Sequence, residues 1–281
     1  MEWSKLKNII LIILLITNLV LLVFVASRWL QESRIQEQTR SEAILFLANR
    51  RVEVEESLVP RRITLRPQTV QRDLERESEA AARLLDGPVE VEARGAEVYR
   101  YFNDSGSVQF HSDGAFSAQF APAAHPAGED REAYCLELLS RLGFEGELAQ
   151  ESGDTLTFRQ TWEGSPIFNH QVTLELTEGC VTAMTSGRGL VGQPEEDTGR
   201  SVITVATALI DFLNGLNTLG DVCSRVERIE EGYAASSSLS GPMTLTPVWQ
   251  ITTDTGTYQL DLVTGELTRT TARGNSAAPA A

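Results

Sequence analysis

Lysine and histidine are scarce in this chain of 281 residues, and their scarcity excludes several kinds of chemistry. The last lysine is Lys7, so neither a phosphate-binding Walker lysine nor a serine–lysine catalytic pair can lie beyond it. The three histidines, His111, His125 and His170, belong to no HExxH motif and to no His/Cys cluster. For His170 we expect the structural role of a hydrogen-bonded histidine at the margin of a sheet.

Other motifs for catalysis or for a bound group are missing as well. Residues 164–166 (Gly-Ser-Pro) lack the closing glycine of a nucleophile elbow, and the glycines of segment 187–192 form no GxGxxG after a strand. The acidic residues at 195–197 and 230–231 lack the alternating oxygen ligands of a calcium loop. The sequence therefore predicts a protein that is not an enzyme, with no catalytic, cofactor-binding or metal site.

Cysteine is also rare. Cys135, Cys180 and Cys223 form no CxxC pair, which excludes a zinc ribbon and a thioredoxin motif. An odd number leaves at most one intramolecular disulfide, and the alternative is that all three are small apolar residues with free thiols.

Positive charge is in deficit. The chain has 24 Lys and Arg against 39 Asp and Glu, a formal net charge of −15. No basic patch is available to displace counterions from phosphates, so we expect no binding to nucleic acid. Hydrophobic residues make up 42% and charged residues 22%, which is typical of a globular protein and excludes wholesale disorder.

One long apolar run is present near the N-terminus. Ile9 to Ala26 carries no charge and would extend roughly 27 Å as a helix, close to the ~30 Å hydrocarbon core of a bilayer. Trp3 and Trp29 flank it where interfacial aromatic residues lie. A cleaved signal peptide is the alternative, but its apolar core spans only about 7–15 residues. We therefore expect a transmembrane helix over residues 9–27, after a cytoplasmic tail over residues 1–8.

The orientation of this span rests on a small asymmetry. Lys5 and Lys7 lie on one side and Arg28, Arg34 and Arg40 on the other, so the positive charges are nearly balanced. The N-terminal tail is short and the bulk of the chain follows the span. We expect a single-pass protein of the cell membrane whose C-terminal part is extracytoplasmic.

Two polar residues interrupt the apolar run. Thr17 and Asn18 lie at its middle, where an amide has no water to bond and is stabilised by a partner helix. They are therefore candidate contacts with another membrane protein. The alternative has about equal weight: the polar groups of both residues form hydrogen bonds within their own helix.

The rest of the chain alternates helical and strand patterns. We expect a helical stalk over 28–50, a small α+β domain over 51–121, a second α+β domain over 129–270 and a disordered tail over 271–281. The segment at 121–128, rich in alanine and proline, is the predicted linker between the two domains.

Capping residues and glycines predict where the helices begin and end. Thr69 is expected to cap a helix that stops at Gly87, and Thr204 to cap one that stops at Gly215. Apolar residues at i, i+3, i+4 and i+7 predict another helix over 135–142. With the strands between them, this order predicts an antiparallel sheet with helices packed on one face, which is an α+β fold.

Two hairpins resemble those of PepSY modules. RQTWEGSPIFNHQVTLEL (159–176) is similar to the pattern Q-x-[YW]-x-G-x-P-[VI]. PVWQITTDTGTYQLDLVTGEL (247–267) is similar to P-x-W-x-[IV] followed by Y-x-[VL]-D-x-x-T-G-[EK]. Alternation along these strands places Trp162 and Trp249 on the buried face of the sheet.

The opening sequence MEWSKLKNIILIILLITNLVLL resembles that of YycI, a family of bitopic accessory regulators of the sensor histidine kinase WalK (YycG). The length of the chain favours YycI over its larger sister YycH. The resemblance implies a regulator of a two-component system, without enzymatic activity, whose partners are the kinase and a YycH-like protein. It implies contacts made through the membrane helix and through the extracytoplasmic domain.

Two other functions compete with this one. The PepSY-like part favours, as the second function, a membrane-tethered peptidase inhibitor or propeptide-like module. A surface hydrolase with an unrecognised site is the third. An adjacent peptidase gene would favour the second, whereas neighbouring genes for a kinase, a response regulator and a YycH-like protein would favour the first.

Overall fold

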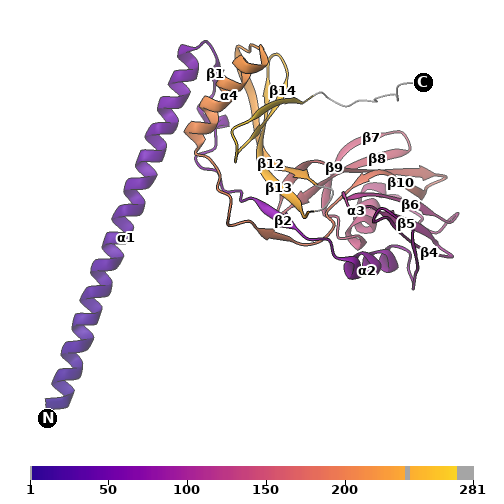
Figure 1. The fold of residues 1–281 in the computed structure, drawn as a ribbon, viewed down its shortest axis with the longest axis horizontal. Helices are drawn as coiled ribbons and strands as arrows, with labels where there is room; N and C mark the ends of the chain where they lie inside the picture. The colour runs from indigo at the N-terminus through magenta and orange to yellow at the C-terminus, as the bar shows by residue number, and fades with distance from the viewer. Residues whose placement is uncertain (1, 238–240, 271–281) are drawn as a thin grey trace.

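The computed structural model describes residues 2–237 and 241–270, and in this part of the chain it has four α-helices, one 3-10 helix and fifteen strands (Figure 1). The fold is α+β, as predicted. The tail predicted over 271–281 lies outside the described residues.

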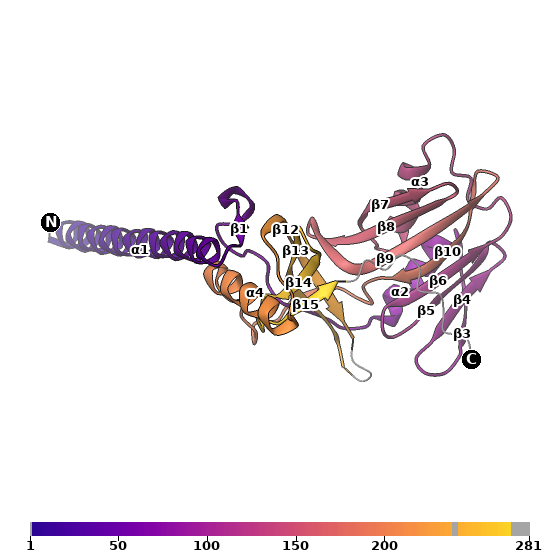
Figure 2. The ribbon, with the colours of Figure 1, turned by 90° about the horizontal axis from the view of Figure 1, so that it is seen from above.

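The first helix, α1 (Glu2–Asn49), is continuous and projects from the rest of the molecule (Figure 1, Figure 2). Its large apolar side chains from Ile10 to Val25 are exposed, with exposed fractions between 54% and 66%. Among the described residues, no helix combines the length and the apolar character that crossing a membrane requires. The span predicted over residues 9–27 is therefore not confirmed. The helix continues through the predicted stalk.

Three times along the chain, a helix is followed by four strands that pair antiparallel in sequence order (Figure 2). The first unit consists of α2 (Leu74–Leu84), β3 (Glu90–Ala93), β4 (Tyr99–Asn103), β5 (Gly106–Phe110) and β6 (Ala115–Phe120). The second consists of α3 (Arg131–Arg141), β7 (Gly146–Ser152), β8 (Thr155–Trp162), β9 (Ser165–Thr177) and β10 (Cys180–Arg188). The third consists of α4 (Val205–Leu219), β12 (Arg225–Ser236), β13 (Met243–Thr253), β14 (Thr257–Asp261) and β15 (Leu267–Thr270).

Pairing between the units joins them into one network of strands. β6 pairs antiparallel with β10, so the first two units share a continuous sheet. β12 pairs parallel with β9 at Tyr233 and Ile167, which connects the third unit to the second. Short elements complete the network: β1 (Glu53–Val54) pairs parallel with β12, and β2 (Gln68–Val70) pairs with β13 and with β11 (Pro194–Glu196). The 3-10 helix η1 (Glu56–Leu58) follows β1.

Two large hydrophobic clusters divide the molecule in a different way from the predicted domains. The first cluster includes Leu84 and Val108 from before the predicted linker and Leu138 and Phe158 from after it. We call the first and second units, which share this cluster, the distal lobe. The segment 121–128 does not separate two cores, because the pairing of β6 with β10 brings both sides of it into one sheet.

The second cluster lies in what we call the proximal lobe, formed by the third unit and the C-terminal end of α1. It includes Leu47 of α1, Phe212 of α4 and Trp249 of β13. Trp249 is completely buried, as predicted, whereas Trp162 at the end of β8 is only partly buried. The predicted stalk is therefore also part of a core.

The helix α2 begins four residues later than predicted. Its N-cap is Asp73, whose carboxylate accepts hydrogen bonds from the backbone N–H groups of Glu75 and Arg76, both at 3.1 Å. Thr69 lies in β2 instead, where both edges of the strand are paired. The prediction was wrong because Thr69 is paired on both sides within a sheet, so no helix can begin directly after it.

The helix α4 begins as predicted and ends later. Thr204 is its N-cap, but the helix passes through Gly215 to Leu219, and Gly220 follows in the left-handed conformation with φ 72°. A Cβ atom at Gly215 would lie 2.3 Å from Cβ of Leu267. Glycine is required there by the close packing of α4 on β15, and not by the end of a helix.

Candidate functional site

The two candidate partner residues lie on the exposed part of α1. The Thr17 hydroxyl donates a hydrogen bond to the carbonyl oxygen of Ile13 at 2.9 Å, so Thr17 is satisfied on its own helix. The Asn18 side chain is exposed and has no hydrogen-bond partner among the described residues. Of the two, Asn18 is therefore the residue with free donors and an acceptor for another chain.

A buried arginine fixes the end of α1 to the loop that follows it. Arg40 is 4% exposed, and its Nη1 donates to the carbonyl oxygens of Glu56 and Val59, both at 3.2 Å. Its Nη2 donates to the carboxylates of Glu37 and Glu56, both at 2.9 Å. Both carboxylates remain largely exposed to solvent, so the guanidinium is the buried charge. The hydrogen bonds offset the cost of removing it from water.

The same face of α1 packs against α4. Ala43 and Leu47 are 4% and 0% exposed, and with Arg40 they are spaced at i, i+3 and i+7, which places the three side chains on one face. After Asn49 the left-handed Arg51, with φ 67°, turns the chain so that β1 can pair with β12. We call this region, formed by the end of α1, η1 and α4, the stalk junction.

The stalk junction and the exposed apolar segment belong to one helix. Asn18 and Arg40 are about 33 Å apart along it, at about 1.5 Å per residue. Ala43 and Leu47 pack in the cluster of the proximal lobe, and Arg40 bonds the loop at 56–59, so a displacement of α1 along its axis would displace the proximal lobe with it. The arrangement couples the position of the exposed part of α1 to that of the proximal lobe.

The histidines occupy separate structural positions. Nδ1 of His170 lies 3.0 Å from Oε1 of Gln160, which confirms the predicted hydrogen-bonded role, although the residue is 1% exposed. Nδ1 of His125 lies 3.3 Å from the Tyr134 hydroxyl oxygen. Within the described ranges, no three His, Cys, Asp or Glu side chains are grouped so that they could hold a metal ion.

Protonation of His170 should destabilise the fold in acid. Burial, with the nearby Arg188 charge, lowers the pKa of His170 to about 4, so between pH ~6.5 and pH ~4 the unfolded chain binds the extra proton. The free energy of unfolding is therefore highest above pH ~6.5. It should decrease by up to about 3 kcal/mol as the pH is lowered from ~6.5 to ~4. Urea unfolding between pH 7 and pH 4.5 measures this.

The matched variant is His170→Gln, which cannot take up the proton. It should flatten the pH dependence relative to the parent. Equal pH dependence in the parent and in His170→Gln would contradict the assignment.

One family model matches most of the second half of the chain. Residues 141–263 match the family model of the YycI protein. The match confirms the resemblance to YycI over most of the second and third units. It includes the PepSY-like hairpin at 159–176 and most of the one at 247–267. YycI is a family of regulatory accessory proteins and not a known family of enzymes. A search of curated proteins found no match.

Two solved structures are similar to the chain. A crystal structure of an uncharacterized protein from Eubacterium rectale ATCC 33656 is 11% identical, with 78% of this chain and 90% of that chain covered and a TM-score of 0.39. The C-terminal domain of YpeB from Bacillus megaterium is 14% identical, with 70% of this chain and 96% of that chain covered and a TM-score of 0.37.

Arg40 was predicted only as a positive charge on one side of the apolar run, and not as part of a site. The available signal was its position three and seven residues before the apolar Ala43 and Leu47, which places a charge on a helix face that must be buried. A buried arginine requires acceptors, and the carbonyl groups of the following loop supply them.

Proposed function

We propose that this YycI-like chain is a membrane-anchored regulatory subunit of a sensor histidine kinase of the WalK (YycG) class. The match of residues 141–263 to the YycI family carries the proposal. The partners that the family implies are the kinase and a YycH-like protein. The stalk junction supports this function, because it links the long helix mechanically to an extended domain.

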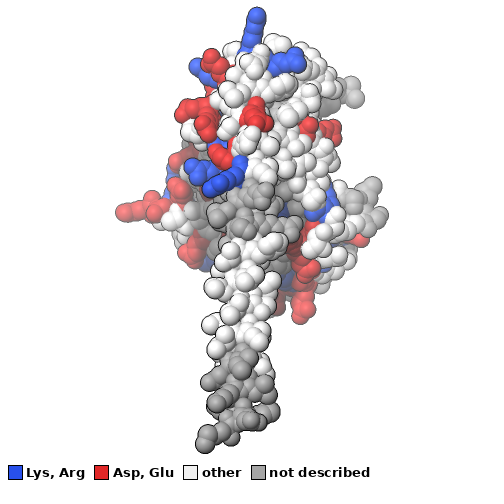
Figure 3. Space-filling view, turned by 90° about the vertical axis from the view of Figure 1, so that its left-hand side faces the viewer, with Lys and Arg blue, Asp and Glu red and all other residues white. Residues whose placement is uncertain are grey.

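The proposal includes anchoring by the apolar part of α1. The described side chains from Ile10 to Val25 are exposed, and Figure 3 shows only uncharged residues on this part of the projecting helix. Transfer of exposed apolar side chains from water into lipid is favourable, at about 25 cal/mol per Å². The remaining chain would then lie outside the cytoplasm, and a fused alkaline phosphatase at the C-terminus should be active in intact cells.

Regulation would operate through the position of α1. In the membrane, the Asn18 amide would bond a helix of the kinase or of the YycH-like protein, because lipid offers no other acceptor or donor. The bound partner would then fix α1, and through Arg40, Ala43 and Leu47 it would fix the proximal lobe. The kinase and this domain would shift together between signalling states.

The test is co-expression of the full chain with its kinase, followed by measurement of kinase autophosphorylation in isolated membranes. Autophosphorylation should differ between membranes with and without the chain. The variant Asn18→Leu should weaken co-purification by about threefold, since one such hydrogen bond averages ~0.6 kcal/mol. The matched variant Thr17→Val should change little, because the Thr17 hydroxyl bonds its own helix.

Two outcomes would contradict these proposals separately. Equal autophosphorylation with and without the chain contradicts the regulatory function. In the second outcome the chain alters autophosphorylation, and Asn18→Leu changes neither this effect nor co-purification. That outcome contradicts only the contact at Asn18 and assigns recognition to the extracytoplasmic domain.

A further inference from the structure

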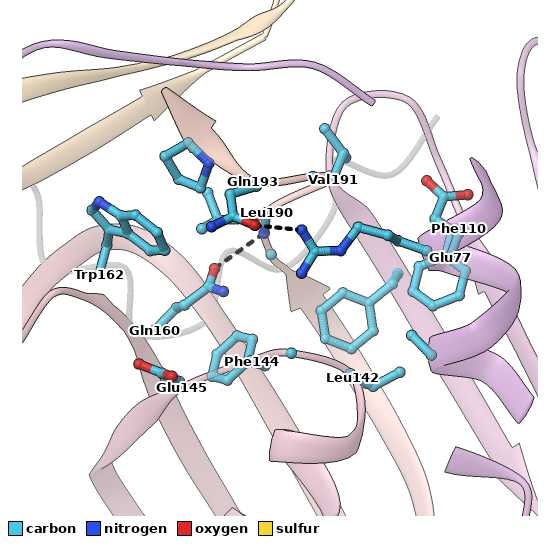
Figure 4. A pocket seen from close by; sticks show the side chains of 18 of the residues that line it. Glu77, Phe110, Leu142, Phe144, Glu145, Gln160, Trp162, Leu190, Val191 and Gln193 are labelled. Atoms are coloured by element: carbon cyan, nitrogen blue, oxygen red, sulfur yellow. Dashed lines mark hydrogen bonds between the residues drawn. The ribbon is translucent and has the colours of Figure 1, made fainter. Parts of the chain in front are cut away.

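A cavity of about 290 Å³ lies in the distal lobe where its two units meet (Figure 4). It is bounded by α2, the hairpin of β5 and β6, the turn between α3 and β7, the end of β8 and the segment 189–194. This volume is just below the roughly 300–1,000 Å³ of drug-sized ligand pockets, so it suits a small ligand. Much of its wall is aromatic or aliphatic, from the side chains of Phe110, Phe116, Leu142, Phe144 and Trp162.

A buried amide presents an unused hydrogen-bond donor to this cavity. Gln160 is 2% exposed, and its Oε1 accepts from the backbone N–H of Leu190 at 3.1 Å and lies 3.0 Å from Nδ1 of His170. Because the Leu190 N–H requires an acceptor, the orientation of the amide is fixed. Its Nε2 points into the cavity above Phe144 and has no hydrogen-bond partner among the described residues (Figure 4). An amide N–H that has no partner at the wall of a cavity is free to donate to a ligand oxygen.

The rim of the cavity supplies a positive charge. Arg76 donates to Oε1 of Gln193 at 2.8 Å and, within the described ranges, forms no ion pair. The neighbouring Glu77 accepts two hydrogen bonds from Arg72, at 2.7 and 3.0 Å, so its charge is already compensated. The other carboxylate of the lining, Glu145, is exposed. The unpaired charge of Arg76 therefore suits this opening to an anion, although the chain as a whole has a net charge of −15.

We propose that the cavity binds a small apolar carboxylate, of the kind that the C-terminal residue of a peptide presents. The apolar group packs against Phe116 and Phe144, an oxygen accepts from Nε2 of Gln160, and the negative charge lies beside Arg76. Such a ligand contacts both units of the distal lobe and the segment 189–194, which leads into β11. Its binding therefore stabilises the packing of these parts against one another.

N-acetyl-L-phenylalanine is a suitable probe because it has an aromatic ring, a carbonyl group and a carboxylate. Titrated by calorimetry into the full chain held in lipid nanodiscs, it should bind saturably at one site and raise the melting temperature. N-acetyl-L-phenylalaninamide keeps the ring and the carbonyl group without the charge, and it should bind about tenfold more weakly. The absence of saturable binding by the acid at millimolar concentration would overturn the proposal.

A tetrapeptide ending in phenylalanine distinguishes two sources of this chemistry. Affinity equal to that of the acetylated amino acid, or higher, supports the end of a peptide as the natural ligand. Affinity at least tenfold lower supports a small free acid, because the cavity then excludes the preceding residues. Both outcomes require the carboxylate, so a peptide amide should bind more weakly than the peptide acid.

The variant Ala80→Leu tests the location of the site. Ala80 is 6% exposed and lines the cavity, so a larger side chain would fill part of the space. Binding should fall at least tenfold, while the melting temperature of the free protein stays the same or rises. Ala82→Leu, on the same helix but outside the lining, is the control and should bind as the parent does. Parent affinity in Ala80→Leu would overturn the assignment to this cavity.

The variant Arg76→Gln tests the role of the charge without disturbing the interior, because Arg76 is exposed. It should weaken binding of the acid about tenfold and leave binding of the amide unchanged, so that the preference for the acid disappears. Arg62→Gln, which also changes an exposed arginine but lies outside the cavity lining, should retain the preference. An intact preference in Arg76→Gln would contradict recognition of a carboxylate at this rim.

Discussion

Replacing Trp249 with alanine should lower the free energy of unfolding by about 3–5 kcal/mol. Trp249 is fully buried in the second hydrophobic cluster, on a strand that pairs with β2, β12 and β14. Its Nε1 also donates to Oε1 of Glu231 at 3.0 Å. Truncation leaves a cavity and removes the donor from a partly buried carboxylate, whose pKa burial already raises. Urea unfolding at pH 7 measures the loss.

The matched variant is Trp162→Ala, which removes the same side chain from a partly buried position. The Trp162 indole lies at the end of β8 in the wall of the distal cavity, and its buried Nε1 has no hydrogen-bond partner within the described ranges. Less apolar surface is lost and no hydrogen bond is broken, so the cost should be about half that of Trp249→Ala. An equal decrease in the free energy of unfolding in the two variants would contradict the difference in burial of the two tryptophans.

The loss at Trp249 should be confined at first to the proximal lobe. Folded proteins of this kind have total stabilities of about 5–15 kcal/mol, so the substitution removes a large share of the total. Limited proteolysis should therefore cleave Trp249→Ala first between α4 and β15, while the fragment containing the first and second units persists. Simultaneous cleavage of both lobes would show that they unfold together.

Local sequence signals predicted the elements of the fold more reliably than their pairing. Thr204 was correctly identified as a helix cap, since a cap depends on a few adjacent residues. The pairing of β6 with β10 could not be predicted, because it joins strands that are separated by a whole helix and three strands. The α+β class was therefore recoverable from patterns alone, whereas the division into lobes required the structure.

The threefold repetition was hidden by unequal strand lengths. In each unit a third strand connects two turns, but β5 and β14 have 5 residues each whereas β9 has 13. A search for a fixed period therefore fails, although the order of helix and four strands is the same each time. The long β9 pairs with β10 inside the second unit and also reaches β12 of the third unit, whereas β10 pairs with β6 of the first unit.

The two candidate sites also differ in how far the sequence alone predicts them. Asn18 could be selected from the sequence because a polar residue in an apolar run is unusual. The environment of Gln160 depends on Leu190 and His170, which only the folded sheet brings together. Its unused donor is therefore a property of the tertiary structure and has no sequence signal.

Replacing Arg40 with leucine should abolish regulation of the kinase while leaving the chain in the membrane fraction. The variant loses four charge-assisted hydrogen bonds to the loop at 56–59 and to two carboxylates, at roughly a kilocalorie or more each. The buried carbonyl oxygen of Val59 is left without this donor, so we expect destabilisation of the stalk junction by about 3–5 kcal/mol. Hydrogen exchange should then increase in η1 and at the end of α1, with little change in the distal lobe.

The control is Arg34→Leu, which removes an exposed arginine less than two turns earlier on α1. It should change stability by less than about 0.5 kcal/mol and should leave kinase autophosphorylation as in the parent. Arg40→Leu instead should give the autophosphorylation of membranes that lack the chain, because the loop at 56–59 no longer fixes the end of α1 in the stalk junction. If Arg40→Leu shows the expected increase in hydrogen exchange but regulates normally, the signal does not pass through the stalk junction, and direct contact between the kinase and the two lobes must carry it.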